Sequence, residues 1–289
     1  MLPGPPGAPI TAPPDAQPPV IGTFASGAPD QAAVEPARLW GFWATLGLGA
    51  VILLAWAFMQ AFVVVVWVIA SMVVHHGAIP RNLERNGLLL SLAVCAAAPV
   101  MIGLSWLFAR IRRGMQPADY LGCRAAKRSE LVRWTIVLLV MILASDALTS
   151  WMGRSIVPEF MARVYQTAGF LPLFWVAIVI AAPFAEEVLF RGFLFEGMLH
   201  SRLGATGAIL LTSLLWSLIH LQYDAYGIAT IFVSGLLLGY VRLKTRSLYA
   251  TIFLHCLMNT VATLEAAVML KYFNPAVGSL GVDWAKELL

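Results

Sequence analysis

The sequence contains few charged residues for its length. Only 12% of its 289 residues are Asp, Glu, Lys or Arg, whereas about 25% is typical of soluble domains. Hydrophobic residues make up 60% of the chain, and the mean hydropathy is +0.80. Its apolar stretches are longer than those that a soluble core requires. The composition therefore excludes an ordinary soluble protein and favours a chain that crosses a membrane several times.

Cysteine is also scarce, and the three residues, Cys95, Cys123 and Cys256, lie far apart without a CxxC pair. This spacing excludes a disulfide framework, and the sequence has no HExxH helix and no apparent internal repeat. The net charge is +4, with basic residues concentrated between positions 110 and 133. We interpret this excess as a guide to membrane topology, and we expect no nucleic-acid partner.

Changes in composition along the chain predict its organisation. The first segment contains ten of the 17 prolines, has no periodicity and lacks the basic start and apolar core of a signal peptide, which predicts a disordered tail. The predicted divisions are a Pro/Ala-rich cytoplasmic tail (1–37), N-terminal transmembrane helices (38–169) with a basic cytoplasmic loop (110–133), a transmembrane core that carries the polar motifs described below (170–272) and a short C-terminal tail (273–289).

Long apolar runs predict an all-α, polytopic transmembrane helix bundle of about seven spans, within a range of six to eight. Pro99 is expected to kink the second span. Placing the basic segment inside the cell puts the N-terminus in the cytoplasm and the C-terminus outside. The expected spans are residues 39–74, 87–109, 131–152, 171–199, 204–220, 227–241 and 248–272.

The fourth expected span carries two adjacent carboxylates, Glu186 and Glu187, and a guanidinium, Arg191. One carboxylate at the centre of a bilayer costs roughly 2.5–3.5 kcal/mol, so two of them need a functional or structural reason. Glu187 lies four residues before Arg191, which is the favourable order for an ion pair on one helix face. Glu186 points about 100° away and has no such partner on its own helix, so we expect it to be available for function.

Two later spans each carry a polar pair at helical spacing. Trp216 and His220 are four apart, and so are His255 and Asn259. A lone buried histidine is more often structural, but two histidines, an asparagine and Glu186 on facing helices would each need a buried partner. This set suits hydrolysis of an amide, with a carboxylate that activates water and donors that stabilise an oxyanion.

The same residues could instead bind a metal. Two histidines and a carboxylate form a known catalytic zinc site with one open position, which here would be Glu186, His220 and His255. The sequence leaves both alternatives open, so the expected cofactor is either zinc or none if the enzyme depends on the glutamate alone.

The ordered set Glu-Glu-x-x-x-Arg, aromatic-x-x-x-His and His-x-x-x-Asn resembles the CPBP family, over roughly residues 170–265. That family includes CAAX prenyl endopeptidases of the eukaryotic endoplasmic reticulum and bacterial Abi-type proteins. The resemblance implies an intramembrane protease whose mechanism is metal-assisted or glutamate-dependent. It implies that Glu186 activates water beside His220, that His255 and Asn259 stabilise the oxyanion, and that Glu187, Arg191 and Trp216 support the site. Trp216 departs from the family's usual Phe.

The predicted function is an intramembrane endopeptidase that cleaves near the C-terminus of a membrane-associated protein or peptide. Its expected partners are that substrate and the lipid bilayer, and its expected location is a bacterial inner membrane. Two alternatives are a non-catalytic immunity or scaffold protein of the same fold and, third, a proton-coupled transporter. The lack of paired repeats argues against the transporter.

Overall fold

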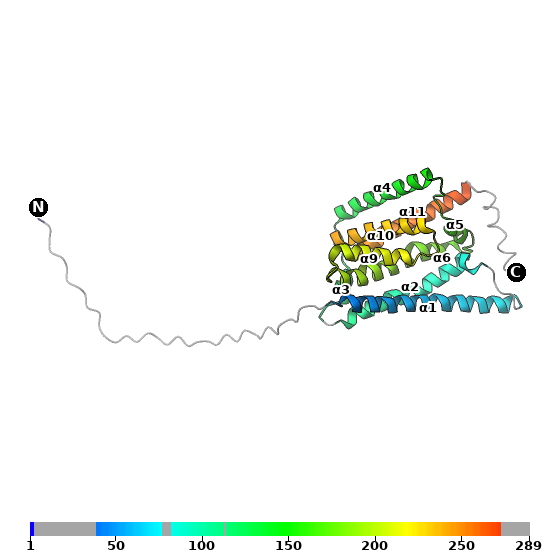
Figure 1. Ribbon diagram of the computed structural model, residues 1–289, viewed down its shortest axis with the longest axis horizontal. Helices are drawn as coiled ribbons and strands as arrows, with labels where there is room; N and C mark the ends of the chain where they lie inside the picture. Colours follow the sequence, from blue (N-terminus) through cyan, green and yellow to red (C-terminus); the bar gives the residue numbers. More distant parts are fainter. Residues whose placement is uncertain (3–38, 77–81, 113, 273–289) are drawn as a thin grey trace. The chain divides into compact units, whose positions relative to one another are not determined.

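The computed structural model describes residues 1–2, 39–76, 82–112 and 114–272. The predictions for the tails, residues 1–37 and 273–289, therefore fall almost entirely outside the described residues. Within the described ranges all regular secondary structure is helical, which confirms the all-α prediction. Figure 1 shows the long helices lying side by side along a common direction.

Six helices in the described ranges are long and apolar enough to cross a membrane, so the chain is an integral membrane protein. Six lies within the expected range of six to eight spans, and the helix at the expected span 204–220 is the one that is too short to be counted. Helix α9 has 15 residues, about 22 Å at 1.5 Å per residue, and falls short of a hydrocarbon core of about 30 Å. The six long helices are α1 (Phe42–Val74), α2 (Gly87–Ile111), α4 (Arg128–Trp151), Leu171–Leu199, α10 (Ala225–Thr245) and α11 (Leu248–Tyr272), and the short one is α9 (Gly204–Leu218).

The fourth long helix, Leu171–Leu199, is called the glutamate helix below. It alternates between α-helical and π-helical backbone along its length, and the Glu-Glu pair lies at the end of the central α-helical turn. π-Helical segments are rare and occur frequently at functional sites. In chain order its parts are α6 (Leu171–Trp175), η2 (Val176–Ala181), α7 (Ala182–Glu187), η3 (Val188–Leu194) and α8 (Phe195–Leu199).

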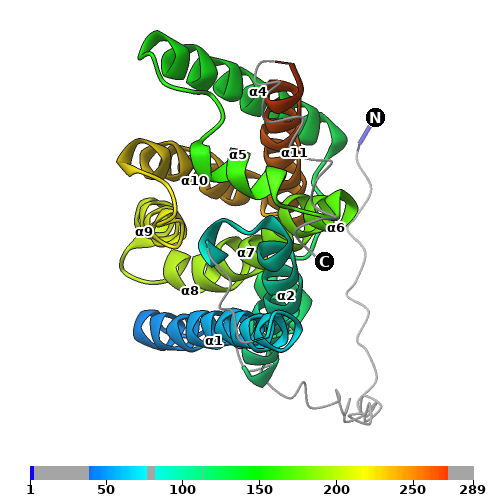
Figure 2. The same cartoon turned by 90° about the vertical axis from the view of Figure 1, so that its right-hand side faces the viewer.

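The glutamate helix lies at the centre of the helix bundle, where it packs against α2 on one side and α11 on another. Figure 2 shows α1 at one edge and α4 at the opposite edge, with α9 and α10 paired beside the centre. The main apolar core forms around the glutamate helix, with Phe190, Phe193 and Phe195 among its fully buried side chains.

One end of the bundle is held together by Arg242, near the end of α10. Its Nε donates to the Arg191 carbonyl oxygen at 2.9 Å and its Nη2 to the Leu121 carbonyl oxygen at 3.3 Å. Leu121 ends the short helix α3 (Pro117–Leu121), and Gly122 follows with φ +73°. A Cβ on Gly122 would lie 2.2 Å from Arg242 Nη2, so only glycine fits. The predicted basic loop 110–133 is thus partly helical and docked on the core.

The opposite end is formed by α5 (Glu159–Gln166), the 3₁₀ turn η1 (Leu83–Arg85) and the connection between α9 and α10. Two surface ion pairs hold this end together: Arg85–Glu159 joins η1 to α5, and Arg154–Asp224 joins the connection after α4 to the one after α9. Asp224 also caps α10 by accepting a hydrogen bond from the Gly227 N–H at 2.9 Å. This hydrogen bond, with help from Arg154, lowers the pKa of Asp224.

Candidate active site

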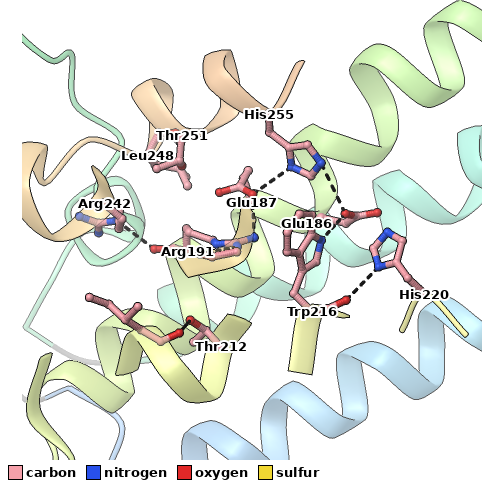
Figure 3. Close-up of polar contacts among 12 residues, drawn as sticks. Glu186, Glu187, Arg191, Thr212, Trp216, His220, Arg242, Leu248, Thr251 and His255 are labelled. Carbon is pink, nitrogen blue, oxygen red and sulfur yellow. Dashed lines mark hydrogen bonds and ion pairs between the residues drawn. The ribbon is translucent and has the colours of Figure 1, made fainter. Parts of the chain in front are cut away.

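Glu187 lies at the centre of a fully buried ion-pair network. Its Oε1 is 2.8 Å from Arg191 Nη1, and neither side chain is exposed. The ion pair predicted from the spacing of four residues is therefore confirmed. The same Oε1 is 3.0 Å from His255 Nδ1, so Glu187 lies between the guanidinium and the imidazole (Figure 3). Burial of this carboxylate is compensated by two partners, which fixes it in place.

Arg191 is held by more than Glu187. Its Nη2 donates to the Gly235 carbonyl oxygen on α10 at 3.2 Å, and its guanidinium lies 4.4 Å from the centre of the Trp216 ring. Gly235 lets α9 pack closely against α10, because a Cβ there would lie 2.9 Å from Ser213 Cβ and 3.1 Å from Trp216 Cε3. Helices α9, α10 and the glutamate helix therefore meet at Trp216.

Glu186 has a different environment from its neighbour. Its Oε2 accepts a hydrogen bond of 2.6 Å from Trp216 Nε1 and is 3.9 Å from His255 Nε2 (Figure 3). Its side chain is 13% exposed, whereas that of Glu187 is fully buried. The sequence predicted that Glu187 is neutralised within its own helix and that Glu186 is not. The geometry agrees, with the addition that Trp216 and His255 reach Glu186 from other helices.

The hydrogen bonds of the two histidines indicate their tautomers. His255 Nδ1 faces a carboxylate and His220 Nδ1 is 2.9 Å from the Trp216 carbonyl oxygen, and both of these oxygens are acceptors. Each Nδ1–H therefore donates to its oxygen, and each Nε2 is the ring nitrogen left for another partner. For His255 that nitrogen faces Glu186.

Asn259 is engaged with the backbone of the glutamate helix. Its Nδ2 donates to the Ile178 carbonyl oxygen at 2.8 Å. In the η2 segment the Ala182 N–H bonds to the Ala177 carbonyl, so the next residue in that pattern would bond to Ile178. That residue is Pro183, which has no N–H. Asn259 thus supplies a missing donor, and one further amide hydrogen remains on its Nδ2.

The arrangement gathers six of the seven predicted site side chains into one chain of direct contacts, from Arg191 through Glu187, His255, Glu186 and Trp216 to His220. Residues 168–261 match one protein-family model, described as type II CAAX prenyl endopeptidase Rce1-like. This segment is an Rce1-like domain. No curated protein and no solved structure matches the chain.

The Rce1-like domain contains every residue of the candidate site, from Glu186 to Asn259. The resemblance recognised in the motifs is therefore confirmed over residues 168–261, which match the Rce1-like family model. Helices α1, α2 and α4 lie outside the matched residues, although α2 packs directly against the glutamate helix.

The predicted zinc ligands in the Rce1-like domain are Glu186, His220 and His255. Among the residues that the structure describes, no group of three His, Cys, Asp or Glu side chains is placed to hold a metal ion. His220 and His255 each direct Nδ1 to an oxygen, as zinc-bound histidines do, so Nε2 is the nitrogen that each would offer to a metal. A catalytic zinc takes three protein ligands at about 2 Å, so Glu186 and both histidines would have to move closer together to hold one.

Tyr223, which also lies in the Rce1-like domain, belongs to none of the three sequence motifs. Its ring stacks on that of His220 with centroids 6.4 Å apart, and its backbone N–H donates to the His220 carbonyl at 3.1 Å. The His220 ring also contacts the Trp216 ring edge-on, with centroids 5.5 Å apart. Burial and the Glu186 carboxylate raise the pKa of Tyr223 to about 12. Its position three residues after His220, in a turn, follows no motif that could have marked it.

Proposed function

We propose that the protein is an intramembrane endopeptidase in which Glu186 activates water to hydrolyse a peptide bond. The observation that supports this most strongly is the contrast between the two glutamates. Glu187 is committed to Arg191 and His255, while Glu186 is partly exposed within the bundle and lies 3.9 Å from His255 Nε2. A carboxylate in this setting can accept a proton and later return it.

In the first step, Glu186 takes one proton from water as the water oxygen bonds to the carbonyl carbon of the substrate. The C–N bond then breaks, and the same proton passes from Glu186 to the departing amine. The products are a carboxylic acid and an amine, and Glu186 regains its charge. Trp216 keeps the carboxylate in position through its indole N–H, which donates to Oε2.

His255 is proposed to stabilise the oxyanion, and this role requires the doubly protonated ring. Its Nδ1–H is committed to Glu187, so only a proton on Nε2 can point at a developing negative charge. The second amide hydrogen of Asn259 is the other proposed donor.

His220 is proposed to orient the water or share its proton. Its ring is held by the Trp216 carbonyl, by the Trp216 ring and by Tyr223, which leaves Nε2 as the acceptor. Binding of zinc would require Glu186, His220 and His255 to move closer together as its ligands.

The proposed location is a bacterial inner membrane with the N-terminus in the cytoplasm. Trp40, just before α1, donates to the Phe108 carbonyl near the end of α2, so α1 begins at the end of the bundle where α3 and Arg242 lie. Lys127, Arg128 and Lys244 lie at this same end, which the positive-inside rule assigns to the cytoplasm. The proposed substrate is a peptide or a membrane-associated protein cut near its C-terminus.

The test is cleavage of a peptide library by protein purified in detergent, with metal content measured by mass spectrometry. Glu186→Ala and Glu186→Gln should each lower kcat/KM by about 10²–10⁴-fold, the usual contribution of a general base. Glu130→Gln, at the start of α4 and outside the site, serves as the matched control and should retain activity.

Unchanged cleavage in Glu186→Ala would refute the proposed role of this residue. Stoichiometric zinc that is lost together with activity in Glu186→Ala would make Glu186 a metal ligand instead of the general base. Absence of cleavage by the wild type, with biological activity preserved in Glu186→Gln, would favour the non-catalytic alternative.

A further inference from the structure

A polar cavity of about 760 Å³ lies at the end of the bundle that holds α5 and the start of α10. We call it the polar vestibule; Ser145, Asp146, Thr149, Arg154, Tyr223 and Asp224 are among its lining residues. Its volume falls within the range of about 300–1,000 Å³ that is typical of ligand pockets. It lies outside the contacts of the site described above, and none of the predicted site residues lines it.

The vestibule adjoins the candidate active site through Tyr223. One face of this ring stacks on His220, and the residue itself lines the cavity. His220 in turn contacts Trp216, whose indole N–H is bonded to Glu186. The path from the cavity to the proposed catalytic carboxylate therefore passes through two aromatic contacts and one hydrogen bond.

The chemistry of the vestibule suits a hydrophilic peptide segment better than a lipid chain. Hydroxyl, carboxylate and guanidinium groups line it, and Thr149 exchanges a 2.7 Å hydrogen bond with Tyr226 at its wall. Both guanidinium groups are already paired, Arg85 with Glu159 and Arg154 with Asp224. The lining contains two further acidic side chains, Glu84 and Asp146, of which Asp146 is hydrogen-bonded to Glu265. Glu84 therefore leaves an excess of negative charge, and the lining should accept neutral or basic segments more readily than acidic ones.

We propose that the polar vestibule binds the hydrophilic flank of the peptide substrate, with Tyr223 as the wall that separates this flank from the scissile bond. This inference rests on the proposed function. With the N-terminus in the cytoplasm, the vestibule opens at the opposite face of the membrane. Tyr223 is a positioning residue in this arrangement, because it acts through the ring of His220.

Blocking the vestibule tests the proposal. In a variant whose three native cysteines are replaced by alanine, Ser145→Cys places a thiol on the lining, and Ser150→Cys places one on the exposed side of the same helix. Both are treated in detergent with 2-sulfonatoethyl methanethiosulfonate, and labelling is quantified by mass spectrometry. The substrate is the best peptide from the library.

Labelled Ser145→Cys should lose at least tenfold in kcat/KM, mainly through a higher KM, while labelled Ser150→Cys should change less than twofold. Full labelling of Ser145→Cys without loss of cleavage would overturn the proposal, and so would failure of this water-soluble reagent to reach the thiol. Failure of the proposed function is distinguishable, because the unlabelled parent would then cleave no peptide.

A pair of peptides that differ only by Lys or Glu on the flank gives a second measurement. The Lys peptide should be cleaved with at least threefold higher kcat/KM in low salt, and the ratio should fall as salt is added. Equal cleavage of the two peptides, or preference for Glu, would contradict binding of the flank in the vestibule.

Discussion

The glutamate helix and the peripheral helices α1 and α4 are all apolar enough to cross a membrane, but they are buried to very different degrees. Within their most apolar stretches, 44% of the glutamate helix is buried, against 6% of α1 and 11% of α4. The peripheral helices expose large side chains such as Phe58 at 73% and Leu143 at 68%. Hydropathy alone therefore identifies a span without showing whether it faces lipid or protein.

The difference lies in what each helix buries. In a bilayer the exclusion of apolar groups from water gives no preference for protein over lipid, so close packing and polar contacts drive helix association. The glutamate helix has such contacts, since Glu187 and Arg191 are fully buried and Arg191 donates to Gly235 of α10. Its polar residues, which are costly in lipid, specify its central position.

The largest expected effect comes from breaking the buried ion pair. Arg191→Met should destabilise the fold by about 3–5 kcal/mol, because Glu187 would remain as a buried charge with His255 as its main partner. Leu143→Ala on α4 is the peripheral control and should change stability far less. Denaturant titration in detergent micelles measures both changes.

The double variant Glu187→Leu/Arg191→Met sharpens this comparison. Removal of both charges should recover much of the stability, because no uncompensated charge remains. Cleavage should stay low, since His255 loses the acceptor that orients its ring. A double variant as unstable as Arg191→Met alone would show that the ion pair is not the source of the effect.

Glycine substitutions are expected to produce an intermediate effect. Gly235→Ala forces Ser213 and Trp216 to move, so we expect a loss of about 1–3 kcal/mol and roughly tenfold lower cleavage through displacement of Trp216 from Glu186. Gly47→Ala on α1 meets no atom within 4 Å and should be neutral or slightly stabilising. Stability and kcat/KM are measured for both variants, and equal effects would remove the distinction between core and periphery.

The smallest effect is expected at Asp224, on the rim of the polar vestibule. Its pKa is lower in the folded state, so its contribution to stability is complete above the unfolded-state pKa of about 3.9 and is lost as the pH falls through the folded-state value. Asp224→Asn should flatten this acid-side decrease and leave stability at pH 7 nearly unchanged, because Asn can also cap α10. Thermal unfolding from pH 2 to 7 measures the difference, and an unaltered profile would assign the decrease to other carboxylates.

The sequence allowed prediction of the features that depend on neighbours within one helix. Apolar runs located the long helices, and the spacing of Glu187 and Arg191 predicted their ion pair. The order of the three motifs identified the family. These signals are local, or they are ordered along the chain, so no knowledge of packing is needed to detect them.

Other features depend on how separate helices pack. The indole of Trp216 reaches Glu186 because α9 and the glutamate helix lie side by side, and α9 itself is shorter than the apolar run suggested. Tyr223 joins the site only because the turn after α9 folds back over His220. Asn259 is predicted to stabilise the oxyanion. Its hydrogen bond to the Ile178 carbonyl could not be predicted, because that carbonyl lacks a backbone donor only in the π-helical segment. The roles of these site residues remain predictions.

The two π-helical segments of the glutamate helix also limit how its length can vary in evolution. Each holds more residues in a turn than an α-helix does, and deletion of one residue would restore regular α-helix while rotating everything beyond it by about 100°. A deletion within 176–181 would change which way Glu186 and Glu187 face relative to the start of the helix. A deletion within 188–194 would separate Arg191 or the docking surface for Arg242 from the carboxylates. Single-residue insertions and deletions should therefore be rare in this helix among homologous sequences, while the exposed helix α1 should tolerate them.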